Sequence, residues 1–156
     1  MTSEPPQAPQ RQSRVLVVDD NLQNLELLVE YLQSLEVQTS TATDGLAALE
    51  AVAREKPDLM LLDIMMPRMS GFEVCRKLKS DPATRDILII MVTALNELGD
   101  IERGVESGTD DFLSKPVNRL ELVTRVKTLL RLRHLKDELE RTLAYLNDVE
   151  SGPAGQ

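Results

Sequence analysis

Short apolar strings alternate with amphipathic segments along most of this 156-residue chain, and this alternation restricts the fold more than any other feature. Three of the strings are apolar nearly throughout, which is typical of strands covered on both faces. The strings predict five strands: VLVV (Val15 to Val18), VQTST (Val37 to Thr41), LMLL (Leu59 to Leu62), ILIIMV (Ile87 to Val92) and DFLS (Asp111 to Ser114). Such an order of elements favours a parallel sheet with helices on both sides.

The segments between the strings have the length and period of helices. Apolar residues recur three and four positions apart in residues 21–34 and 44–54, which gives each segment one apolar face. These residues are Leu25, Leu28, Val29 and Leu32 in the first segment, and Leu46, Leu49 and Val52 in the second. Capping boxes at residues 70–73 and 118–121 predict two more helix starts, and residues 97–106 supply a further helix. We therefore expect an α/β, flavodoxin-like (βα)5 doubly wound parallel sheet with strand order 2-1-3-4-5.

The composition excludes several classes of function. With 42% hydrophobic and 28% charged residues, the chain has no apolar run near the roughly 20 residues that cross a bilayer. The N-terminal MTSEPPQAPQRQS has no apolar core of a secretion signal, so we expect a cytoplasmic protein without a membrane partner. A formal charge of −8 argues against direct nucleic-acid binding. The single cysteine, Cys75, cannot form an internal disulfide and is expected to pack as a small hydrophobe.

Four predicted strands are followed by acidic, hydroxyl or ammonium side chains. In an open parallel sheet the carboxyl ends of the strands share one edge, and ligand sites form there. The residues are Asp19 and Asp20 after the first strand, Asp63 after the third, Thr93 at the end of the fourth and Lys115 after the fifth. We expect these five side chains to converge.

Three carboxylates held together repel one another unless a cation compensates. Mg²⁺ suits such a site, because one or two carboxylates, waters and a phosphate oxygen satisfy it. Lys115 can neutralise a further anionic oxygen and Thr93 can donate a hydrogen bond. Asp63 then remains as the nucleophile, so the set favours phosphoryl transfer to a carboxylate.

The motifs VVDDN, LLDIMMPRMSG, MVTA and FLSKP occur in order from about Arg14 to Leu132, and in this the chain resembles the receiver domain of a two-component response regulator. The resemblance implies that Asp63 accepts a phosphoryl group from a histidine kinase or phosphotransfer protein. It implies Asp20 and Asp63 as direct Mg²⁺ ligands, Asp19 as a ligand through water, and the Met65 carbonyl as a further ligand. It also implies a protein that catalyses only its own phosphorylation and dephosphorylation and is not otherwise an enzyme.

The resemblance extends to a conformational switch. Thr93 and Lys115 would bind the phosphoryl group, and Lys115-Pro116 is expected to be a cis peptide. Thr93 would then move and the aromatic Phe112 would rotate inward, although simple core packing of Phe112 is an equal alternative. Met65 and Leu95 line the approach of hydrolytic water in such domains. Because neither side chain can orient water, we expect slow autodephosphorylation.

The C-terminal segment departs from the alternation. A continuous helix from Asn118 to about Val149 would be roughly 45 Å long at about 1.5 Å per residue, which exceeds what one small domain can cover. Residues three and four apart form an a/d seam with one polar position: Leu132, Leu135, Leu139, Thr142, Leu146 and Val149. We expect a parallel homodimer or a signal-transmitting helix, with a helix folded back on its own domain as the alternative. His134, among basic neighbours, is expected to be a solvated helix residue.

The predicted organisation is therefore a disordered arm (1–13), a receiver domain (14–132), a helical extension able to form a coiled coil (133–150) and a flexible tail or linker (151–156). The chain is either complete or precedes an output domain, and receivers before cyclic-di-GMP domains have a similar extended helix. A phosphatase-like hydrolase would need a second acid where Met65 stands. A nucleotide-binding flavodoxin-like protein would need a glycine loop where Asp19-Asp20-Asn21 stands. A receiver fold that is not phosphorylated would not need all five site residues.

Overall fold

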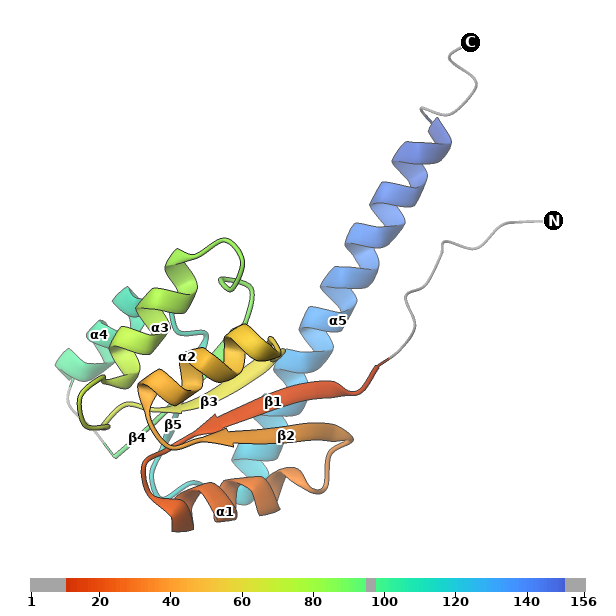
Figure 1. The fold of residues 1–156 in the computed structure, drawn as a ribbon. Helices are drawn as coiled ribbons and strands as arrows, with labels where there is room; N and C mark the ends of the chain where they lie inside the picture. The colour runs from red at the N-terminus through yellow and green to blue at the C-terminus, as the bar shows by residue number, and fades with distance from the viewer. Residues whose placement is uncertain (1–10, 95–97, 151–156) are drawn as a thin grey trace.

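A five-stranded parallel sheet forms the centre of the computed structural model, which describes residues 11–94 and 98–150. The strand order is β2-β1-β3-β4-β5, as predicted (Figure 1). The strands are β1 (Ser13–Val18), β2 (Val37–Ala42), β3 (Leu59–Asp63), β4 (Leu88–Thr93) and β5 (Asp111–Ser114). Because β1 pairs with both β2 and β3, the order reverses there, and the ends of β1 and β3 lie side by side.

Helices cover both faces of this sheet. They are α1 (Leu22–Leu32), α2 (Gly45–Arg54), α3 (Gly71–Ser80), α4 (Leu98–Ser107) and α5 (Arg119–Glu150). One core contains side chains from α1 and α5, and the other contains side chains from α2 and α3. Along β1, Val15 and Val17 belong to the first core, while Leu16 and Val18 belong to the second. Burial on both faces is the reason why the central strands are apolar nearly throughout.

Side-chain caps start four of the helices. Asn21, Asp44, Ser70 and Asn118 each accept a hydrogen bond from the main-chain N–H three residues later, at 2.7 to 3.3 Å. Each cap satisfies a donor that has no partner within the helix. The caps at Ser70 and Asn118 agree with the predicted helix starts. The predicted start of the fourth helix at Glu97 lies outside the described residues.

The predicted apolar face of α2 is wrong at Leu46, whose side chain is 61% exposed. The buried residues of α2 are Gly45, Ala48 and Val52, and Leu49 is partly buried against the same core, so the prediction is confirmed at Val52 and Leu49. These positions share one side of the helix, while Leu46 lies about 100° further round. On the buried side, Gly45 lies against Met69 and Ala48 belongs to the core.

Cys75 is fully buried in α3, and its thiol donates a hydrogen bond to the Ser107 carbonyl at 3.3 Å. Burial raises the pKa of this thiol. Cys75 is therefore a packing residue, as predicted.

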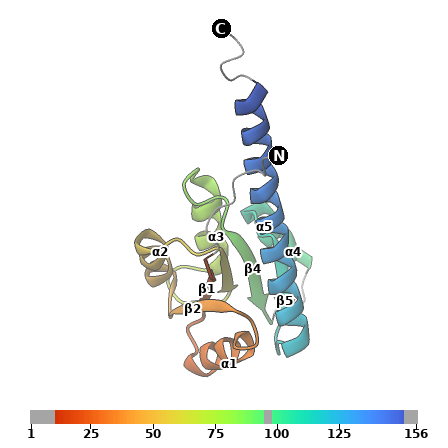
Figure 2. The same cartoon turned by 90° about the vertical axis from the view of Figure 1, so that its right-hand side faces the viewer.

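The last helix runs far beyond the domain. Of its 32 residues only Leu122 and Val126 are fully buried, and its C-terminal part projects away from the sheet in both views (Figures 1 and 2). At about 1.5 Å per residue it is roughly 48 Å long. His134 is exposed and pairs with Glu138 one turn later, at 3.1 Å. Despite the length of α5, no helix in the described part of the chain is apolar enough to cross a membrane.

Candidate functional site

Three carboxylates meet where the carboxyl ends of β1 and β3 lie side by side. Asp19 follows β1 and is fully buried, Asp63 ends β3 and is 3% exposed, and Asp20 is exposed to solvent. Each offers a carboxylate oxygen, and these atoms all lie within 4.8 Å of one another. The predicted convergence of these acids is therefore present in the structure.

Lys115 comes to the same site from the end of β5, on the far side of β4. Its Nζ lies 3.2 Å from Asp19 Oδ2 and 3.4 Å from Asp63 Oδ1. Burial favours the neutral amine, but the charges of Asp63 and Asp19 outweigh this effect and raise the pKa of Lys115. The ammonium group thus stays charged between two buried carboxylates. The Lys115-Pro116 peptide is cis, as expected.

Main-chain groups hold the two buried acids in place. The N–H of Asn21 donates to Asp19 Oδ1 at 2.9 Å, and the N–H of Met65 donates to Asp63 Oδ1 at 3.3 Å. After Asp63 the chain turns sharply, because the N–H of Gly71 donates to the Ile64 carbonyl at 2.9 Å. This approach leaves no room for a side chain on Gly71: a Cβ there would lie 2.4 Å from the Asp63 carbonyl oxygen.

The environment of Asp63 disfavours its charge. Burial and the nearby negative charge of Asp19 raise the pKa of Asp63 to about 6, although the charge of Lys115 lowers it. A second cation would relieve this repulsion. The donor set fits Mg²⁺, which prefers oxygen ligands and keeps some waters. Asp19, Asp20 and Asp63 would hold the ion, and the exposed position of Asp20 leaves one side open to water.

Thr93 and Phe112, the two residues of the predicted switch, lie on the last two strands. Thr93 ends β4 and is 6% exposed, and its carbonyl accepts the Lys115 N–H at 2.8 Å. The Phe112 ring packs against α4 at Gly104, where an added Cβ would meet the ring at 2.4 Å. Phe112 is also packed against the core on the α3 side of the sheet. The position of Phe112 is compatible with simple core packing and with the predicted inward rotation of its ring.

Of the two residues expected to shield the site from water, only Met65 lies within the described residues. Its side chain is 65% exposed beside the acids. Leu95 falls outside the described residues. Sequence reasoning did not identify Gly71 as a site residue, although a glycine eight positions after Asp63 was the available signal.

The fold and this site define a class: a doubly wound α/β domain with an acidic pocket and a lysine at the switch point of the sheet. The model of the response regulator receiver domain matches residues 15–127. The chain belongs to this family.

Known relatives agree with the assignment. The chain is 49% identical over 129 residues to the response regulator PleD of Caulobacter vibrioides, covering 83% of this chain and 28% of PleD. It is 42% identical over 137 residues to the DNA-binding response regulator MtrA of Mycobacterium tuberculosis, covering 88% of this chain and 58% of MtrA. The chain thus spans less than two thirds of these relatives.

A solved structure shares the fold. The receiver domain of a signal transduction histidine kinase from Syntrophus aciditrophicus superposes with a TM-score of 0.72 at 35% identity. The match covers 76% of this chain and 90% of that one. Receiver domains therefore occur in longer proteins of more than one kind.

Proposed function

We propose that this receiver domain accepts a phosphoryl group onto Asp63 from a histidine kinase or phosphotransfer protein. The observation that carries the proposal is the meeting of Asp19, Asp63 and Lys115 from three strand ends, with contacts of 3.2 and 3.4 Å. A carboxylate that is buried, oriented by a main-chain N–H and adjacent to a cation is placed as a nucleophile.

In the proposed reaction an Asp63 carboxylate oxygen attacks the phosphorus of a phosphohistidine. The new O–P bond forms as the P–N bond breaks, and the imidazole leaves with the bonding electrons and is protonated by solvent. Mg²⁺, when bound, neutralises charge on the phosphoryl oxygens. Lys115 binds one of these oxygens and thereby stabilises the charge of the transition state. Thr93 donates to another after a movement of its strand end.

The donor would dock beside the acids. A groove of about 420 Å³ lies between α1 and the segment from Lys115 to Val117 that precedes α5. Its lining includes Leu27, Tyr31 and Val117 together with Asp19 and Lys115. Leu22 and Met65 are both 65% exposed. Exposed apolar side chains around a charged centre favour the docking of a partner protein.

We propose that α5 mediates a homodimer and that this dimer carries the signal to the output. Its outward side in the domain is polar at Glu121, Thr124 and Thr128, but from Leu132 onward it becomes apolar. Six side chains there are each 49% to 60% exposed: Leu132, Leu135, Leu139, Leu143, Leu146 and Val149. We call these six residues the stripe, and a second copy would cover it as in a coiled coil. Phosphorylation would then change dimerisation or the contacts of an output domain.

Intact mass spectrometry tests the phosphoacceptor. With Mg²⁺ and acetyl phosphate, the wild type should gain about 80 Da. Asp63→Asn should gain nothing, whereas Asp58→Asn, which removes an acid from the opposite edge of the sheet, should gain as much as the wild type. An adduct that persists in Asp63→Asn would contradict the proposal.

Light scattering tests the dimer. The wild type should have twice the chain mass of 17.4 kDa, and Leu139→Glu should return it to the monomer. Ala144→Glu adds the same charge on the polar side of α5 and should stay dimeric. A wild type that is monomeric in both the unphosphorylated and the phosphorylated form would exclude the dimer.

A cytoplasmic location stays a prediction from the sequence.

A further inference from the structure

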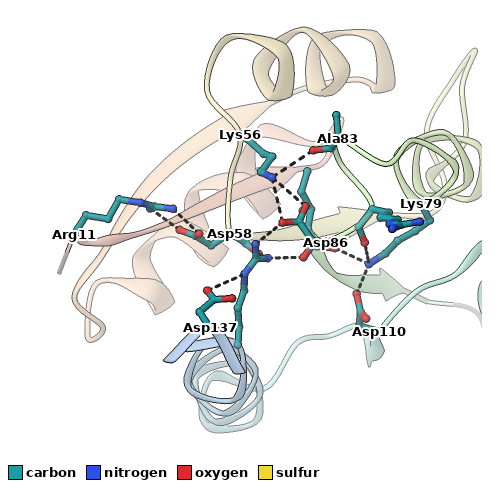
Figure 3. Close-up of polar contacts among 11 residues, drawn as sticks. Arg11, Lys56, Asp58, Lys79, Ala83, Asp86, Asp110 and Asp137 are labelled. Atoms are coloured by element: carbon teal, nitrogen blue, oxygen red, sulfur yellow. Dashed lines mark hydrogen bonds and ion pairs between the residues drawn. The ribbon is translucent and has the colours of Figure 1, made fainter. Parts of the chain in front are cut away.

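The edge of the sheet opposite the acids carries a second polar cluster, shown in Figure 3. Asp58 precedes β3 and Asp86 precedes β4, so both lie at the amino ends of central strands. Cations from three separate segments meet them: Arg11 before β1, Lys56 before β3, and Arg133 in α5. We call Asp58 and Asp86 the platform. Neither acid has a part in the proposed phosphoryl transfer.

Arg133 makes the contacts that join α5 to the platform. Its Nη1 donates to the main-chain carbonyl of Asp58 at 3.3 Å and, by a short hydrogen bond, to that of Asp86. Its Nη2 donates to Asp86 Oδ2 at 2.9 Å. The side chain is only 17% exposed, although the next residues on either side, Leu132 and His134, are more than half exposed.

Other groups hold the platform independently of α5. Both carboxylate oxygens of Asp58 accept from Arg11, at 2.8 and 2.9 Å, and the N–H of Arg14 donates to Asp58 at 2.7 Å. Lys56 donates to both oxygens of Asp86, at 3.0 and 3.2 Å. Because the strands and these cations fix the acceptors, Arg133 binds to a site that is already rigid.

The position of Arg133 along α5 decides what this contact can do. Arg133 lies seven residues, about two turns, after the buried Val126, so it extends the buried side of the helix. Leu135 lies nine residues, about two and a half turns, after Val126, so the stripe points to the opposite side. One turn beyond Arg133 the buried side becomes polar at Asp137. The contact therefore lies where α5 leaves the domain. Before this point the apolar side of the helix faces the domain, and after it the apolar side of the helix is the stripe, which points the opposite way.

We infer that Arg133 is a positioning residue that fixes the direction of the α5 extension and the side toward which the stripe points. A planar guanidinium bound to two carbonyls and a carboxylate resists both bending and rotation of the helix. The contacts of Arg133 come from two nitrogens of one planar group, Nη1 to the carbonyls and Nη2 to the carboxylate, whereas a lysine would offer a single ammonium on a flexible stem and restrain the helix less. This inference extends the proposed output role of α5, but the geometry on which it rests does not depend on phosphorylation.

Distances between spin labels in the full chain test this inference without Mg²⁺ or a phosphoryl donor. Labels at Ala53→Cys in α2 and Ala144→Cys in α5 report the direction of the extension. Labels at Ala53→Cys and Lys127→Cys report the position of the part of α5 that precedes Arg133. Labelled chains are diluted with unlabelled wild type so that only distances within one chain are measured, and the parent with its buried Cys75 gives the background.

Arg133→Met should make the distribution of distances between labels at residues 53 and 144 about twofold broader. The distribution of distances between labels at residues 53 and 127 should not change. Arg133→Lys should broaden the first distribution too. Arg131→Met removes an exposed arginine from the same helix and should leave both distributions as in the wild type. Because a general loosening of the domain would broaden both pairs, the two pairs together separate positioning from stability.

Two results would overturn the inference: an unchanged distribution of distances between residues 53 and 144 in Arg133→Met, or equal broadening in Arg131→Met. If Arg133→Met does not fold, Arg133→Gln, which retains a donor, is measured and judged by the same two results. A chain that fails to accept phosphate leaves this measurement intact, so failure of the proposed function and failure of this inference are distinguishable.

Discussion

Lys115 Nζ lies 3.2 Å from Asp19 Oδ2, although the two residues are 96 positions apart in the chain. One follows β5, at the edge of the sheet, and the other follows β1. The ion pair therefore spans the carboxyl ends of β3 and β4, and the same Nζ lies 3.4 Å from Asp63 Oδ1. This relationship makes the lysine part of the acidic site.

Lys115→Met should slow phosphorylation of Asp63 by acetyl phosphate about 100-fold, which is the usual effect of removing one charge-stabilising donor from a transition state. The adduct, once formed, should still be on Asp63. The rate is measured by intact mass over time at fixed Mg²⁺. An unchanged rate would mean that Lys115 has only a structural role.

Gly71→Ala should destabilise the domain by about 1–3 kcal/mol, because the new Cβ would lie 2.4 Å from the Asp63 carbonyl oxygen and 2.8 Å from Ile64 Cα. The control is Gly99→Ala in α4, where a Cβ meets nothing within 4 Å. That substitution should be neutral or stabilise the helix by up to about 1 kcal/mol. Urea unfolding measures the free energy of unfolding of both variants. Equal values for Gly71→Ala and Gly99→Ala would refute the predicted difference.

Gly104→Ala should displace the Phe112 ring, since the added Cβ would meet ring atoms at 2.4 and 2.5 Å. Overpacking of this kind costs about 1–3 kcal/mol. Phe112→Leu in the same chain should restore much of the lost stability, because a smaller side chain leaves room for the methyl group. Thermal unfolding of the single and double variants measures the coupling. Additive effects would show that the two residues do not interact.

Asp58→Asn should destabilise the protein more at neutral pH than in acid. Burial acts to raise the pKa of Asp58, but the hydrogen bonds from Arg11 and Arg14 and the charges of Arg11 and Arg133 outweigh it and lower the pKa. A lowered pKa means that the carboxylate contributes stability above its unfolded-state pKa of about 3.9 and loses it as pH falls through the folded-state value.

The difference in unfolding free energy between the wild type and Asp58→Asn should therefore be about 1–3 kcal/mol at pH 7 and shrink below about pH 4. Denaturant unfolding at several pH values measures it. A difference that does not change with pH would contradict the assigned charge state.

Much of the fold was predictable because the signal lies in patterns along the chain. Strands buried on both faces are apolar nearly throughout, as β3 is from Leu59 to Leu62, and a cap such as Ser70 satisfies a helix start locally. The site was predictable in part because parallel strands bring their carboxyl ends to one edge, which places Asp19 near Asp63. The failure at Leu46 has a local cause: the small residues Gly45 and Ala48 are buried on the same helix, and a search for large apolar residues cannot detect them.

The contacts of Arg133 could not be predicted from the sequence. An arginine between Leu132 and His134 on a charged helix is typical of a solvated position. Two of its three acceptors are main-chain carbonyls. Every residue has a carbonyl, so the residue types in the sequence do not reveal these acceptors. Only the strand order and the path of α5 bring these acceptors within reach.

The central claim is that Asp63 itself carries the phosphoryl group, and borohydride trapping tests it most directly. Reduction of an aspartyl-phosphate gives homoserine, and trypsin should release residues 55–68, which contain both Asp58 and Asp63. After treatment with Mg²⁺ and acetyl phosphate, tandem mass spectrometry should find homoserine at position 63 and unmodified aspartate at 58. Homoserine at position 58, or at neither position in a phosphorylated chain, would contradict the account.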